Sequence, residues 1–226
     1  MAVFIEHLKK HFSADLIFSE RKYPLKGENI DFSSFLENRK SYAGFYIDIG
    51  THHPYPFSNT LHFLQKGWQK ITIEPTSESA NLFNLFSNTG MVINTEQGAN
   101  HESSMLYYLK NRKNSGSTTE IAEKSITTFN TIIKTVNVRE MPLAAVLHNN
   151  LPAGQTIDFL SLDAAGFDMR ALKSIDWTRY IPLFIIVKVN AGIKGGAPAI
   201  CSFLIQKNYE QVAQTDRAYF FKYGGK

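Results

Sequence analysis

Short apolar runs alternate with amphipathic segments along most of the chain. Apolar runs of about 4–8 residues bounded by turn residues are typical of buried strands, and apolar residues spaced three or four apart are typical of helices. The apolar runs predict strands over 45–49, 70–73, 91–94, 157–162 and 183–189. The spaced apolar residues predict helices over 57–65, 77–86, 142–147, 168–172 and 197–206. This alternation predicts an α/β fold with a mostly parallel, twisted sheet and helices on both of its faces.

Two regions interrupt or close this pattern. Residues 103–109 and 132–138 alternate between apolar and polar positions, which predicts a β-arm or hairpin. The polar segment 111–119 between them is either a lid or a disordered loop. Residues 209–213 and 218–223 predict a final strand pair, with the last strand antiparallel to the sheet.

The first forty residues predict a helical extension before the main domain. Phe4, Ile5, Leu8 and Phe12 recur at helical spacing. Residues 23–27 predict a turn, and a second short helix is expected to start near residue 31. We therefore divide the chain into an extension over 1–40 and one domain over 41–226.

Composition narrows the class of protein. Apolar residues make up 43% of the 226 residues, enough to form a core. The net charge of +4 is spread along the chain, which indicates a solvated surface and no nucleic-acid partner. Its single cysteine, Cys201, excludes an intramolecular disulfide and a cysteine-based zinc site. The longest apolar run is too short to span a bilayer. We expect a cytoplasmic protein with no membrane partner, and the sequence is compatible with a homo-oligomer.

The candidate chemistry lies where the predicted strands end, because ligands of open α/β sheets bind beyond the carboxyl ends of strands. Gly50 permits close approach of a ligand to the backbone, or else simply forms a tight turn. Glu74, 24 residues later, can accept hydrogen bonds from ribose hydroxyls, or else caps the next helix. A G-x-G-x-x-G motif does not follow the first strand, which disfavours NAD and FAD.

Several motifs together resemble the FkbM-type methyltransferases over roughly residues 41–223. They are 44–54, 57–60, 66–68, 73–75 and 157–168. The resemblance implies a class I, Rossmann-like methyltransferase fold and S-adenosylmethionine as cofactor. It also implies O-methylation of a hydroxyl on a sugar, a glycan or a related small molecule. The cofactor-binding set expected on this basis is Asp48, Gly50, Thr51, Asn59, Glu74, Pro75, Gly98 and Asp163.

The chain departs from the family pattern on the expected acceptor side. Ala165 and Lys188 stand where the family usually has carboxylates, so the sequence predicts no metal site. Deprotonation of a hydroxyl then falls to His53, His52 or Asp163, although either histidine is equally explained as a turn residue. Lys188 is either a surface residue or the partner that neutralises Asp163. The sequence thus leaves two functions open: an active methyltransferase, or a family member that binds the cofactor with lost or altered catalysis.

Overall fold

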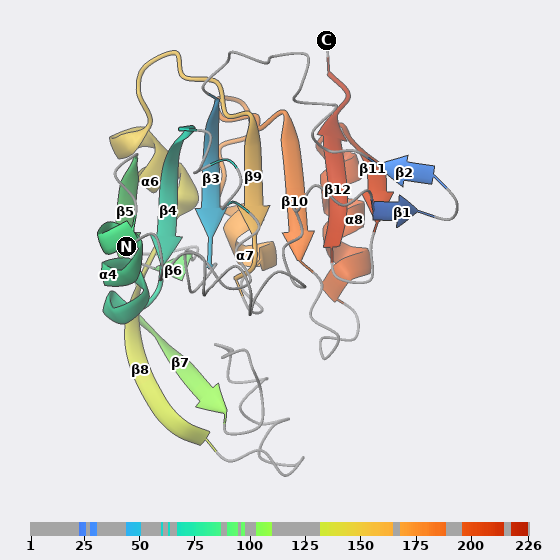
Figure 1. The fold of residues 1–226 in the computed structure, drawn as a ribbon. Helices are drawn as coiled ribbons and strands as arrows, with labels where there is room; N and C mark the ends of the chain where they lie inside the picture. Colours follow the sequence, from blue (N-terminus) through green and yellow to red (C-terminus); the bar gives the residue numbers. More distant parts are fainter. Residues whose placement is uncertain are drawn as a thin grey trace, which may run out of the picture.

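The computed structural model describes residues 23–25, 28–30, 44–50, 60, 63, 67–86, 90–94, 96–97, 103–109, 132–164, 168–188, 196–214 and 218–225. Its centre is a seven-stranded sheet with the order β11-β12-β10-β9-β3-β4-β5 (Figure 1). The strands are β3 (Phe45–Ile49), β4 (Gln69–Glu74), β5 (Met91–Asn94), β9 (Phe159–Leu162), β10 (Phe184–Lys188), β11 (Tyr209–Gln214) and β12 (Ala218–Tyr223). The strands from β10 to β5 pair in parallel, whereas β12 runs antiparallel to both neighbours. The predicted mostly parallel sheet with an antiparallel last strand is confirmed.

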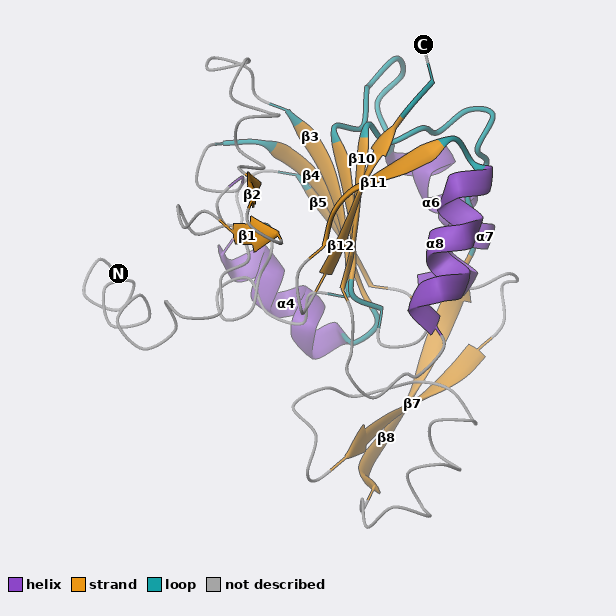
Figure 2. Ribbon diagram, turned by 90° about the vertical axis from the view of Figure 1, so that its right-hand side faces the viewer, coloured by secondary structure: helices purple, strands orange, loops and turns teal. Residues whose placement is uncertain are grey.

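Helices cover both faces of this sheet. They are α4 (Ser77–Phe86), α6 (Leu143–Asn150), α7 (Asp168–Lys173) and α8 (Gly196–Gln206). Figure 2 shows α6, α7 and α8 on one face and α4 on the other. None of the described helices is long and apolar enough to cross a membrane. The helix expected over 57–65 lies almost entirely outside the described residues.

The face under α6, α7 and α8 is apolar. Alternate strand residues point to it, since side chains along a strand alternate between faces. Ile47, Leu160 and Ile185 from three adjacent strands are at most 1% exposed and pack in one cluster with Leu147 and Leu204 from the helices. Full burial of each such side chain contributes about 1.5–3 kcal/mol to folding.

The opposite face begins with an aromatic layer. The rings of Tyr46 and Phe159 stack with centroids 4.9 Å apart, and Phe63 lies 4.6 Å from Phe159. Trp68 packs beside them, with its centroid 4.9 Å from that of Phe63. A Cβ on Gly44 would come within 2.3 Å of the Trp68 ring, so this position has no room for a side chain. Trp68 is thus a packing residue.

The second tryptophan, Trp177, packs against the core cluster. Trp177 donates from Nε1 to the Leu172 carbonyl at 2.9 Å and meets Phe203 and Tyr209 edge-on. Cys201 in α8 is partly buried, and burial raises its pKa. This is the behaviour of a packed thiol, because a reactive cysteine needs a lowered pKa.

A β-arm extends from the end of the sheet where the parallel strands finish (Figures 1 and 2). It consists of β7 (Ser103–Leu109) and β8 (Ile132–Met141), paired antiparallel, and the short β6 (Glu96–Gln97) pairs with the base of β8. The predicted hairpin is confirmed, although β8 continues three residues beyond the predicted 138. Its base is fixed to the domain, since Arg170 of α7 lies 2.6 Å from the buried Glu140 carboxylate.

The extension contains a small correction. Residues 23–25, which were predicted to begin a turn, instead form a strand, β1 (Tyr23–Leu25), and this strand pairs antiparallel with β2 (Glu28–Ile30). Pro24 disfavours a helix because it lacks the N–H that a helix interior uses. The helices expected over the rest of 1–40 lie outside the described residues.

Candidate functional site

Polar side chains meet where the parallel strands end. They are Asp48 in β3, Glu74 at the end of β4, Asp163 after β9 and Lys188 at the end of β10. Backbone hydrogen bonds hold these ends together: Gly50 donates to the Ile73 carbonyl at 3.0 Å, and Asp163 donates to the Ile49 carbonyl at 2.9 Å. The structure therefore brings together Asp48, Gly50, Glu74 and Asp163 where the parallel strands end.

Gly50 is required by the chain itself. Its φ is +77°, and a Cβ there would lie 2.5 Å from the Asp163 carbonyl oxygen and 3.1 Å from the Ala164 Cα. An L side chain would therefore meet both backbone strain and a clash with backbone atoms. The tight turn alone accounts for a glycine at this position, so a ligand-binding role of this end of the sheet depends on the neighbouring residues.

Glu74 is not the cap of the helix that follows it. The Thr76 hydroxyl accepts the backbone N–H of Ser79 at 3.2 Å, and the Thr76 carbonyl accepts the Ala80 N–H at 3.0 Å. Thr76 thus occupies the N-cap position of α4. The half-buried Pro75 separates it from Glu74, which is itself fully buried. The sequence allowed two roles for Glu74, ribose binding or helix capping. The capping role is filled by Thr76.

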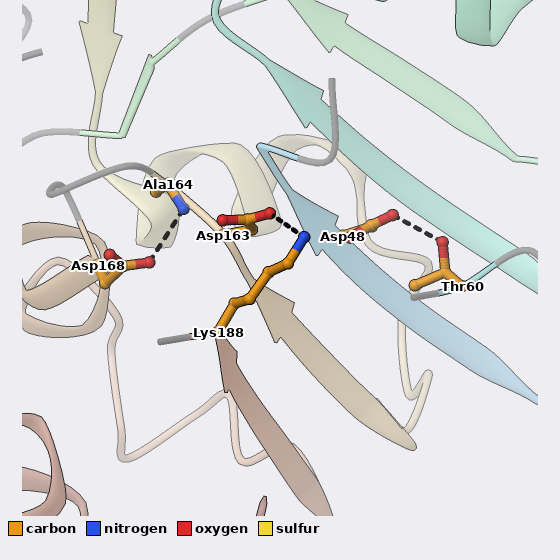
Figure 3. Close-up of polar contacts among 6 residues, drawn as sticks. All are labelled: Asp48, Thr60, Asp163, Ala164, Asp168 and Lys188. Atoms are coloured by element: carbon orange, nitrogen blue, oxygen red, sulfur yellow. Dashed lines mark hydrogen bonds and ion pairs between the residues drawn. The ribbon is translucent and has the colours of Figure 1, made fainter. Parts of the chain in front are cut away.

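Asp48 is buried within β3, one residue before the carboxyl end of the strand. Its Oδ2 accepts the Thr60 hydroxyl at 2.7 Å, as Figure 3 shows. In the sheet register Asp48 pairs with Thr72 on one side and Ser161 on the other. Its negative charge and, above all, burial raise the pKa of Tyr46, while Thr60 opposes this. Asp48 is therefore the centre of a polar row across three strands.

Lys70 is a buried cation that the sequence reasoning did not include in the site. It is 2% exposed, and its Nζ lies 4.8 Å from the Phe83 ring centroid. Burial lowers its pKa to about 8, while the Asp48 and Glu74 carboxylates act in the opposite direction. The signal was present in the sequence, since Lys70, Thr72 and Glu74 alternate with Ile71 and Ile73 and must share one face.

Asp163 and Lys188 form an ion pair. The Lys188 Nζ lies 2.6 Å from Asp163 Oδ2 (Figure 3), and the two side chains are only 18% and 12% exposed. Burial raises the pKa of Asp163 to about 6, with Lys188 opposing the rise and Asp168 and Asp48 adding to it. Of the two explanations for Lys188, the structure supports the one in which it neutralises Asp163.

Asp168 fixes the turn that leaves β9. It is 8% exposed, and its Oδ1 accepts the Ala164 N–H at 2.9 Å (Figure 3). Asp168 is also the first residue of α7, where a carboxylate suits the positive end of the helix dipole. It orders the backbone next to Asp163 and was not among the expected site residues.

A model of the FkbM methyltransferase domain matches residues 48–212. The chain belongs to this family. The match covers the whole edge from Asp48 through Lys188 and agrees with the family expected from the sequence motifs.

Two solved structures resemble this chain at low sequence identity. A human methyltransferase 10 domain containing protein is 14% identical with a TM-score of 0.43, over 98% of this chain and 93% of its own. The METTL16 methyltransferase domain is 13% identical with a TM-score of 0.45, over 98% and 77%. The search of curated proteins by sequence gave no match.

Part of the expected site of this FkbM methyltransferase lies outside the described residues. These residues are Thr51, His52, His53, Asn59, Gly98 and Ala165. The described part supplies buried carboxylates, a glycine turn and an ion pair at one edge. In that part of the chain no group of three or more His, Cys, Asp or Glu side chains is arranged to hold a metal ion.

Proposed function

We propose that this FkbM methyltransferase transfers a methyl group from S-adenosylmethionine to a hydroxyl group of a sugar, a glycan or a related small molecule. Family membership over residues 48–212 supports methyl transfer. The observation that carries the cofactor assignment is Glu74, a buried carboxylate at the end of β4 whose capping role is taken by Thr76.

The edge residues fit an adenosyl ligand with a positive sulfonium. Glu74 would accept hydrogen bonds from the ribose hydroxyls, as acids at this position of Rossmann-like sheets do. Asp48 adds negative charge nearby, which favours a cation where the surroundings exclude water. When bound, S-adenosylmethionine supplies a methyl group activated by the sulfonium. The other residues of the proposed cofactor-binding set are Gly50, Thr51, Asn59, Pro75, Gly98 and Asp163.

A hydroxyl acceptor must lose its proton as the methyl group transfers, and the chain has to supply the base. Asp163 is one candidate. A carboxyl group with a pKa of about 6 is ionised at neutral pH, and because this pKa is close to neutral pH, the carboxylate can take up a proton during the reaction. His53 and His52 are the other candidates. The Lys188 ammonium holds Asp163 Oδ2 in place.

Methyl transfer to a defined acceptor tests this function. The purified chain is incubated with S-adenosylmethionine and a panel of monosaccharides, oligosaccharides and other hydroxyl compounds. We expect S-adenosylhomocysteine and O-methylated product in equal amounts by mass spectrometry. If Asp163 is the base, Asp163→Asn lowers the rate by about 10²–10⁴-fold. An unchanged rate in that variant assigns the base to His53 or His52.

A second candidate is a family member that binds the cofactor without transferring its methyl group. The Asp163–Lys188 ion pair favours it, because this carboxylate is already engaged. Binding of S-adenosylhomocysteine without transfer to any acceptor supports this candidate. The variant Ala165→Glu/Lys188→Glu restores both family acids, and transfer by it alone would attribute the loss to these positions. Transfer by the wild-type chain excludes the candidate.

A further inference from the structure

Three carboxylates gather where β3, β9 and α7 meet (Figure 3). Asp48 belongs to β3, Asp163 follows β9, and Asp168 begins α7. Asp48 and Asp168 are less than a tenth exposed, and Asp163 is 12% exposed. Burial raises the pKa of Asp163, and the charges of Asp168 and Asp48 raise it further, so both carboxylates interact electrostatically with Asp163. Carboxylates in such an arrangement need a cation, because water is excluded and cannot screen them.

Lys188 supplies that cation from the neighbouring strand. Val187 pairs with Leu162 in the register of β10 and β9, so Lys188 and Asp163 leave adjacent strands at the same level. The Nζ–Oδ2 distance is 2.6 Å. Among the cations in the described part of the chain, Lys188 is the one whose charge and hydrogen bond lower the pKa of Asp163.

The other contacts show that the carboxylates are held in fixed directions. Asp48 is oriented by the Thr60 hydroxyl and Asp168 by the Ala164 N–H. Asp163 is oriented by Lys188 itself. Carboxylate oxygens are the ligands that Mg²⁺, Mn²⁺ and Ca²⁺ prefer. The carboxylates in the described part of the chain do not form a three-ligand site, and beside Asp163 the ammonium group of Lys188 would repel a metal cation.

We propose that Lys188 is a tethered cation that takes the place of a divalent metal ion beside Asp163. It is a positioning residue: it keeps Asp163 ionised and oriented, and it excludes metal from the site. The role of Lys188 in catalysis rests on the proposed function. The exclusion of metal ions by Lys188 does not depend on that function and requires only that the chain is folded.

The proposal is tested by titrating the chain with Mn²⁺ alone. Binding is measured as the loss of the EPR signal of the free ion. The wild-type chain and the Lys188→Arg variant are expected to show no specific site at millimolar Mn²⁺. Lys188→Glu places a carboxylate beside Asp163, and we expect it to bind one ion with a Kd on the order of 10⁻⁴ M, the range of weak oxygen-ligand sites. Lys188→Met, which removes the charge without adding a ligand, should fall between them.

The matched control is Lys173→Glu, which makes the same change of charge at an exposed position at the end of α7. It should bind Mn²⁺ no better than the wild-type chain. Far-ultraviolet circular dichroism and thermal unfolding establish that each variant is folded. Should Lys188→Glu not fold, the comparison of Lys188→Met with Lys188→Arg carries the same test, since only the loss of charge should increase Mn²⁺ affinity.

Two results would overturn the proposal. One is a Mn²⁺ site in the wild-type chain that Asp163→Asn abolishes. The other is a folded Lys188→Glu variant that binds no more Mn²⁺ than Lys173→Glu. Both are read without turnover, so they are distinct from a failure of methyl transfer. Where turnover is found, the wild-type rate should be unaffected by EDTA, and a rate abolished by EDTA would contradict the proposal.

Discussion

The two faces of the central sheet come from the same strands but carry different side chains. On the face under α6, α7 and α8, the strand residues are apolar and pack against the helices. On the other face, an aromatic layer is followed by Asp48, Thr72 and Ser161, each fully buried, and then by the edge with Glu74. A buried strand needs no polar residue for folding, so the second face identifies where the chain departs from what stability requires.

The hydroxyl groups of this polar row sharpen the contrast. In the part of the chain that the structure describes, Thr72 Oγ1 and Ser161 Oγ are buried and form no hydrogen bond. A buried hydroxyl without a partner costs about 1–3 kcal/mol. The apolar face has strand residues that contribute stability, whereas this row has residues that reduce it and therefore serve another purpose.

Two adjacent residues of β9 test the contrast with the largest expected effect. Leu160 faces the apolar cluster and Ser161 faces the polar row. Leu160→Ala should lower the free energy of unfolding by about 2–5 kcal/mol, because it removes buried methyl groups and leaves a cavity. Ser161→Ala is the matched control and should change it by less than about 1 kcal/mol or increase it. Urea denaturation measures both, and equal losses would break the distinction between the faces.

The polar side should also carry a pH dependence. The pKa of Asp163 is raised from its ordinary 3.8 to about 6, so the folded chain binds this proton more tightly than the unfolded chain. The associated stability is present below about pH 4 and lost as the pH rises to about 6. Relative to Asp163→Asn, the wild-type chain should lose on the order of 1–3 kcal/mol across this window, since one pKa unit is about 1.4 kcal/mol. Urea denaturation at several pH values measures the difference, and a constant difference would contradict the assignment.

The smallest effect is expected at Thr72. Thr72→Val replaces the unpartnered hydroxyl by a methyl group of similar shape, so the free energy of unfolding should stay the same or rise by about 1 kcal/mol. Thermal unfolding at two pH values is sufficient to measure it. A loss above about 1 kcal/mol would show that the hydroxyl has a partner in the folded chain.

The sequence predicted most of the fold because both strand types have clear patterns. The continuous apolar run of β3 and the alternation of β7 and β8 were enough to place these elements. Helix α4 was predicted at Ser77–Phe86 and found there. The β1–β2 hairpin was missed because its strands have three residues each, too few for a periodicity to appear.

The site was predicted as a set of strand ends, and its interactions were not. Asp48, Glu74 and Asp163 were expected from their positions at the ends of strands. That Thr76 and not Glu74 caps α4 depends on a side-chain direction that spacing does not give. The burial of Lys70 follows from packing under Phe83, and the choice between a paired and a solvated Lys188 needed the register of β9 and β10.

Calorimetric binding of S-adenosylhomocysteine to the wild-type chain and to Glu74→Ala tests the central claim most directly. The matched control is Glu78→Ala, an exposed acid in the first turn of α4. We expect the wild-type chain and the control to bind alike. Glu74→Ala should bind about 10–150-fold more weakly, corresponding to a charge-assisted hydrogen bond of about 1.5–3 kcal/mol. Equal affinity in all three, or no binding by the wild-type chain, would contradict the account.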